Sequence, residues 1–196
     1  MFELFDVVAL VQWGGYLGVA AIIFAESGLF FGFFLPGDSL LFTAGFLASQ
    51  GYLNFWLLAP LLFIAAAAGD SVGYAFGYRV GPALFSRPDS RFFRHEHLIR
   101  TQKFFEKYGA RAVVLARFMP IVRTFTPILA GVGKMRYASF LTYNLAGAGL
   151  WAVGVTGVGY FLGSAVPGID RYLFPIIITI IIISILPSCY EYLKRK

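Results

Sequence analysis

Residues 24–49 read FAESGLFFGFFLPGDSLLFTAGFLAS, two apolar arms on either side of the break Pro36-Gly37-Asp38. Each arm has about ten residues, too few to cross a hydrocarbon core of ~30 Å as a helix. A proline-glycine break at that depth is tolerated only where it contacts protein or water. The stretch therefore predicts a re-entrant hairpin with its tip at residues 36–38.

Composition places this hairpin in a membrane protein. The chain has 196 residues, of which 59% are hydrophobic and 13% are charged, whereas soluble domains average about 25% charged residues. We expect one integral membrane domain over residues 1–196. The net charge of +6 comes largely from a loop at residues 86–111 and from the C-terminal tail. This distribution is typical of cytoplasmic segments beside anionic lipid and indicates no nucleic-acid partner.

A second broken apolar segment runs from Ala112 to Gly133. It contains Pro120 and Pro127, and it carries Arg117 and Arg123. We interpret it as a second re-entrant hairpin, with Arg123 at its tip between the two prolines.

About four spanning helices complete the expected fold, near Val7–Ala25, Phe55–Arg79, Tyr137–Leu162 and Tyr172–Tyr190. If neither hairpin crosses the membrane, the basic loop and both termini are cytoplasmic, and the hairpins enter from opposite faces. The prediction is an all-α polytopic membrane protein with two oppositely facing re-entrant helical hairpins in an inverted-repeat arrangement. The first eight residues contain no Lys or Arg, so we expect no secretory signal peptide.

Four charged residues lie inside these apolar stretches: Glu26, Asp38, Arg117 and Arg123. Each costs roughly 2.5–3.5 kcal/mol to insert, so such residues usually mark a pathway for something polar. The two acids and two arginines cancel in formal charge. Simpler interpretations stay open, since Glu26 could lie at an interface, Asp38 could cap a helix, and the arginines could snorkel.

Other polar residues are weaker candidates. Asp70 lies beside a glycine stripe at positions 69, 73 and 77 that favours helix packing, and it is either a third acidic site or a polar clamp. Asn144 is expected to make an interhelical hydrogen bond. The sequence has no Walker A motif and no G-x-S-x-G motif, and its histidines, His95 and His97, lack further metal ligands at suitable spacing. We expect a transporter without a metal or cofactor, not an enzyme.

Several ordered motifs resemble the DedA family of bacterial inner-membrane proteins, which is related to the VTT-domain (SNARE-associated Golgi protein) scramblases of eukaryotes. The resemblance covers residues 24–163. Tyr78 stands where many members have arginine, and Arg79 follows it. The matching residues are Glu26 with Pro36-Gly37-Asp38; Gly69-Asp70, Gly73-Tyr74 and Gly77; Arg117-Phe118, Pro120 and Arg123; and Ala130-Gly131, Met135, Phe140, Asn144, Gly147 and Trp151.

The resemblance implies two facing re-entrant hairpins and a role in moving lipid-linked phosphates across the membrane. Some members are linked to undecaprenyl phosphate, and others to phosphatidylethanolamine or to maintenance of the proton-motive force. It also implies that Glu26, Asp38, Arg117 and Arg123 are required residues.

The preferred hypothesis is a flippase for a lipid phosphate in the bacterial cytoplasmic membrane. Arg117 and Arg123 would bind the phosphate, and Glu26 and Asp38 would exchange protons. Supporting roles are expected for Pro36, Gly37, Asp70, Pro120, Pro127 and Asn144. The alternatives are a proton-coupled antiporter for small cations or drugs, an uncoupled phospholipid scramblase, and an assembly partner without transport. A homo-oligomer stays open.

Overall fold

The computed structural model describes residues 7–29, 35–85, 108–109 and 111–165, and the single positions 175 and 179. Some predictions fall outside these residues. They concern the N-terminal residues, the stretch 30–34 in the first hairpin, most of the basic loop and the last spanning helix. What the sequence predicts for these four regions stays a prediction.

Every regular element in the described ranges is helical, which confirms the all-α expectation. The last three elements join end to end into a single helical rod over residues 137–165. The elements are α1 (Val7–Gly28), α2 (Gly37–Ser49), α3 (Phe55–Phe85), α5 (Arg111–Ala116), α6 (Pro120–Val132), α7 (Tyr137–Ala148), the π-helical turn η3 (Gly149–Val153) and α8 (Gly154–Ala165).

Within the described residues, three helical stretches are long and apolar enough to cross a membrane, and they match three of the predicted spans. They are Val8–Gly28, Phe55–Gly81 and the helical rod Tyr137–Ala165. Helices α2 and α6 have 13 residues each. At 1.5 Å per residue each is about 20 Å long, which is shorter than the hydrocarbon core of ~30 Å.

The described beginning of the first apolar arm belongs to α1. Residues 24–28 continue α1, so Glu26 lies in its last turn. No proline precedes this point in α1, and the helix instead has its kink at Gly15, where φ is +52°. Glycine accepts this left-handed backbone without the steric cost of a Cβ.

The expected position of Arg123 at a hairpin tip was wrong. The break lies at residues 117–119, and α6 contains both Arg123 and Pro127. Pro120 begins α6, where a missing N–H costs nothing because no acceptor precedes it in the helix. Pro127 removes the hydrogen bond that the Arg123 carbonyl would otherwise accept. Its ring packs beside Gly73 of α3, since a Cβ at Gly73 would lie 3.4 Å from the Pro127 Cβ.

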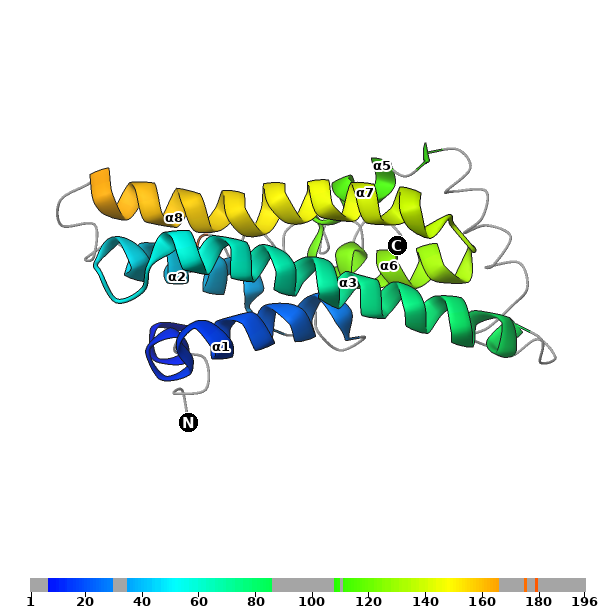
Figure 1. The fold of residues 1–196 in the computed structure, drawn as a ribbon, viewed down its shortest axis with the longest axis horizontal. Coiled ribbons are helices and arrows are strands. Elements are labelled where there is room, and N and C mark those ends of the chain that lie inside the picture. Colours follow the sequence, from blue (N-terminus) through cyan, green and yellow to red (C-terminus); the bar gives the residue numbers. More distant parts are fainter. Residues whose placement is uncertain are drawn as a thin grey trace, which may run out of the picture.

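Two long elements organise the packing. Helix α3 and the helical rod run antiparallel along the length of the molecule (Figure 1). The short helices fill the space beside them: α2 packs mainly on α8, and α6 packs mainly on α3. In the same way α1 packs on α3, and α5 packs on α7.

Glycines bring α2 and α8 into backbone contact. A Cβ at Gly45 would collide with the Thr156 carbonyl, and a Cβ at Gly159 would collide with the Phe42 carbonyl. The contact is reciprocal. The glycine of each helix faces the backbone carbonyl of the residue three positions before the glycine of the other helix.

Helices α6 and α3 repeat this contact at the same spacing. A Cβ at Gly131 would collide with the Tyr74 carbonyl, and a Cβ at Gly77 would collide with the Ile128 carbonyl. The glycine stripe of α3 is thus a packing face, as predicted. Gly69, on the same stripe, faces the Phe24 carbonyl of α1.

Candidate functional site

The polar residues gather halfway along the two long elements. Asp70 is the middle residue of α3, which has 31 residues from Phe55 to Phe85. Trp151 is the middle residue of the 29-residue helical rod. Two groups of side chains meet here, and they are described in turn.

The first group, the Arg123 site, joins three helices. The Arg123 guanidinium of α6 pairs with Glu26 of α1 through Nη2 and with Asp38 of α2 through Nη1, the latter at 2.8 Å. The Glu26 side chain is 1% exposed and the Asp38 side chain 22%. A single guanidinium therefore holds two carboxylates from segments 97 and 85 residues away in the chain.

Trp151 completes the Arg123 site. Its indole Nε1–H donates a hydrogen bond to Asp38 Oδ1 at 2.6 Å. The Arg123 guanidinium carbon lies 4.4 Å from the centre of the indole ring. A guanidinium over a desolvated indole face is stabilised by cation–π attraction, so Trp151 holds Arg123 through its face and Asp38 through its edge.

The second group, the Arg117 site, ties α3 to α7. The Arg117 guanidinium forms an ion pair with Asp70 and donates to Asn144 Oδ1 at 2.6 Å. The Asn144 amide in turn donates to the Ala67 carbonyl at 2.9 Å. Asn144 is fully buried, so the predicted interhelical hydrogen bond is confirmed.

Two glycines make room for these charges. A Cβ at Gly37 would overlap the carboxylate of Glu26, and a Cβ at Gly147 would lie 2.8 Å from Arg117 Cδ. The site thus depends on the absence of a side chain at each position. The sequence predicted a supporting role for Gly37. In the structure Gly37 leaves space for the Glu26 carboxylate.

All four charged residues singled out in the sequence are brought together. Arg117 and Arg123 are buried among the helices, which excludes simple snorkelling. Asp38 lies in the first turn of α2, where it pairs with Arg123. Pro36 precedes α2, and its carbonyl accepts a hydrogen bond from Ser39 Oγ at 3.0 Å.

The formal charge of the site differs from the expected balance. Asp70 joins Glu26 and Asp38, so three carboxylates face two guanidiniums. The fully ionised cluster therefore carries a formal charge of −1 instead of zero.

Trp151 was missed as a candidate site residue. In the sequence it appeared only as one of the residues that match the DedA family. Its spacing of seven residues from Asn144 places both on one helical face, which was the available signal.

The Nε groups of Arg117 and Arg123 are buried and lack a hydrogen-bond partner within the described ranges. An unpaired buried donor costs the desolvation of that group, about 1–3 kcal/mol or more when it is charged. Each arginine therefore has an unused donor inside the protein.

Comparisons with known proteins give consistent matches. Residues 35–161 match the VTT domain family. The chain is 47% identical over 177 residues to Protein DedA of Escherichia coli, covering 89% of this chain and 80% of that protein. It is 47% identical over 167 residues to an uncharacterized membrane protein of Mycobacterium leprae, covering 85% and 74% of the two chains. No solved structure matches the chain significantly.

Proposed function

Because the chain belongs to the DedA family of VTT-domain membrane proteins, we propose that it is a transporter for a lipid-linked phosphate. The substrate would be undecaprenyl phosphate or a phospholipid, and the location a bacterial cytoplasmic membrane with both termini cytoplasmic. The observation that carries this proposal is the buried cluster of two guanidiniums and three carboxylates at the middle of α3 and the helical rod.

Arginine is the side chain best suited to a phosphate at low dielectric. Its planar fork of N–H donors matches phosphate oxygens, and it stays charged when buried. Arg123 is the better placed of the two, because its partner Asp38 is 22% exposed whereas the Asp70 side chain beside Arg117 is 7% exposed. The unpaired Arg123 Nε adds a donor for a substrate oxygen. Arg117 would contribute mainly its positive charge.

The charge of the cluster supports proton coupling. A phosphate anion would enter a site of formal charge −1, which is electrostatically unfavourable at low dielectric. A proton on Glu26 or Asp38 would bring the cluster to zero, and a protonated Asp38 would release an N–H donor of Arg123. Uptake of protons with phosphate, and their release on the other side, would couple transport to the proton gradient.

The proposal includes two re-entrant hairpins that meet at the bilayer midplane. One would comprise the end of α1 with α2, and the other α5 with α6. The matching glycine contacts of α2 with α8 and of α6 with α3 support an inverted repeat, since two related halves would make the same contacts. Helices about 20 Å long suit arms that end halfway across the membrane.

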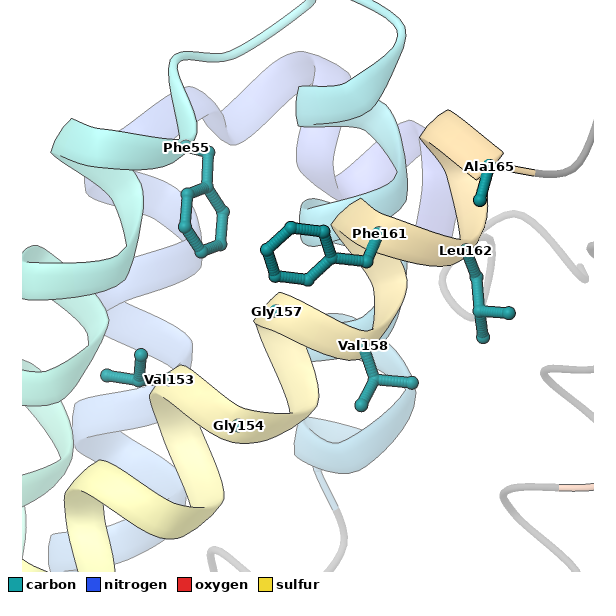
Figure 2. Close-up of a pocket in the computed structure, with 8 residues that line it drawn as sticks. All are labelled: Phe55, Val153, Gly154, Gly157, Val158, Phe161, Leu162 and Ala165. Atoms are coloured by element: carbon teal, nitrogen blue, oxygen red, sulfur yellow. The ribbon is translucent and has the colours of Figure 1, made fainter.

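The lipid tail requires an apolar path beside the charged site. A groove of about 600 Å³ lies between the start of α3 and the outer face of α8 (Figure 2). Its lining is apolar and includes Phe55, Val153 and Phe161. Val153 is two residues beyond Trp151, so the groove begins at about the level of the head-group site along the helical rod, on another side of it.

Head-group transfer in reconstituted liposomes tests the proposal. Undecaprenyl phosphate transfer would be measured for the wild type, Arg123→Ala and Arg123→Lys, with and without a pH gradient. We expect gradient-dependent transfer by the wild type and background transfer by both variants, because lysine keeps the charge but loses the fork. Full activity of both variants would overturn the mechanism. Transfer that is indifferent to the gradient would identify an uncoupled scramblase.

A second candidate is a proton-coupled antiporter for small cations or drugs. The excess of one carboxylate over the guanidiniums favours a cation in the site. Proton exchange in vesicles without any lipid carrier separates the two functions. Exchange driven by an added cation and lost in Glu26→Gln would favour the antiporter.

A further inference from the structure

One oxygen of Asp38 receives two buried N–H donors. Arg123 Nη1 donates to Asp38 Oδ1 at 2.8 Å, and Trp151 Nε1 donates to the same oxygen at 2.6 Å. Converging N–H donors, one of them charged, form the kind of arrangement that binds an oxyanion. Asp38 Oδ1 thus occupies an anion-binding position made by Arg123 and Trp151.

Asp38 is also the residue of the Arg123 site whose side chain is most accessible for displacement by a substrate. Its side chain is 22% exposed, whereas that of Glu26 is 1% exposed and Trp151 is buried. It lies in the first turn of α2, after the break at Pro36. Glu26 is instead enclosed against Gly37, as the overlap of a Cβ there with its carboxylate indicates.

We propose that Trp151 is an anion-binding residue, and that a substrate phosphate oxygen replaces Asp38 on the N–H donors of Trp151 and Arg123. The inference rests on the proposed function and adds a ligand and an order of events to it. Asp38 holds the donors in the empty site and competes with the substrate. Glu26 remains on Arg123 throughout.

The two contacts of Trp151 have separable roles. The indole face lies against Arg123 at 4.4 Å and fixes the guanidinium, while the indole N–H binds the anion. Trp151→Phe keeps an aromatic face and removes the donor. Trp151→Leu removes both the aromatic face and the N–H donor. Comparing it with Trp151→Phe therefore isolates the effect of losing the cation–π contact.

Direct binding tests the proposal without relying on transport. Purified full-length protein in detergent would be titrated calorimetrically with a short-chain isoprenyl phosphate. The matching isoprenol and inorganic phosphate serve as controls that separate the tail, the head group and free phosphate. We expect Trp151→Phe to bind the isoprenyl phosphate about tenfold or more weakly, the effect of one hydrogen bond to a charged group.

Asp38→Ala gives an opposite and more telling result. Removing the competing carboxylate is expected to strengthen binding of the isoprenyl phosphate several-fold, although Asp38→Ala would lose proton-coupled transport. A purely structural Asp38 would give weaker binding in the same variant. If thermal melting shows that Trp151→Phe is not folded, the binding measured for Asp38→Ala still decides the test.

Intrinsic fluorescence provides a second readout. The other tryptophans, Trp13 and Trp56, are exposed and would be replaced by Phe so that Trp151 alone reports. Its emission is expected to change with isoprenyl phosphate and to stay constant with isoprenol.

The outcomes distinguish the two proposals. Unchanged affinity in Trp151→Phe and weaker binding in Asp38→Ala would overturn the inference, while binding lost in Arg123→Ala would leave the proposed function standing. A folded wild type that binds no isoprenyl phosphate would overturn both.

Discussion

Arg117 and Asp70 form an ion pair in the middle of the molecule, with 3% and 7% of their side chains exposed. Breaking a buried pair by removing one partner leaves an uncompensated charge, which typically costs about 3–5 kcal/mol. Replacing both partners with apolar residues of similar size is often close to neutral.

The first prediction concerns the stability of this pair. Arg117→Met and Asp70→Leu are each expected to destabilise the protein by about 3–5 kcal/mol, and the double variant by much less. Thermal unfolding in detergent would measure the three variants. Losses that simply add in the double variant would show that the two residues do not act as a pair.

The second prediction concerns Gly37. Gly37→Ala is expected to abolish transport, because the new methyl group would occupy the space of the Glu26 carboxylate and separate it from Arg123. Gly18→Ala, in the same helix as Glu26, is the matched control, since a Cβ there meets nothing within 4 Å. The control should retain transport and gain up to about 1 kcal/mol of helix stability. Equal transport by both variants in the liposome assay would contradict this account.

The third prediction concerns the matching glycine contacts. Gly45→Ala and Gly131→Ala are expected to destabilise the protein by similar amounts, about 1–3 kcal/mol each, because each methyl group would strike a backbone carbonyl of the neighbouring helix. Gly18→Ala, where a Cβ meets nothing within 4 Å, is the control. Unfolding midpoints would be compared in detergent, and a large effect in only one of the pair would argue against two equivalent halves.

The fourth prediction concerns pH. The groups that set the charge of the site are Glu26, Asp38, Asp70, Arg117 and Arg123. A proton added to a carboxylate makes the cluster less negative, so phosphate binding is expected to strengthen as the pH falls. Glu26→Gln should bind phosphate at neutral pH more tightly than the wild type, and its transport should no longer respond to a gradient. Binding that weakens on acidification would reverse the proposed sign.

Much of the fold follows from local properties of the sequence. The long spans can be read from the length of the apolar runs, and the packing face of α3 from glycines at helical spacing. The four charges inside apolar stretches marked the polar site, because unpaired charges are costly there. The helical nature of the chain and the interhelical role of Asn144 were predictable on the same grounds.

The tertiary structure alone decided which charges meet. Arg123 pairs with Glu26 and Asp38 across 97 and 85 residues, and Arg117 pairs with Asp70 across 47. Periodicity describes one helix at a time, so it cannot choose among partners on different helices. Trp151 joined the site only because the helical rod lies beside α3 at the level of Asp70. Arg123 lies within α6 and not at a tip, because the helix begins at Pro120 and continues through Pro127.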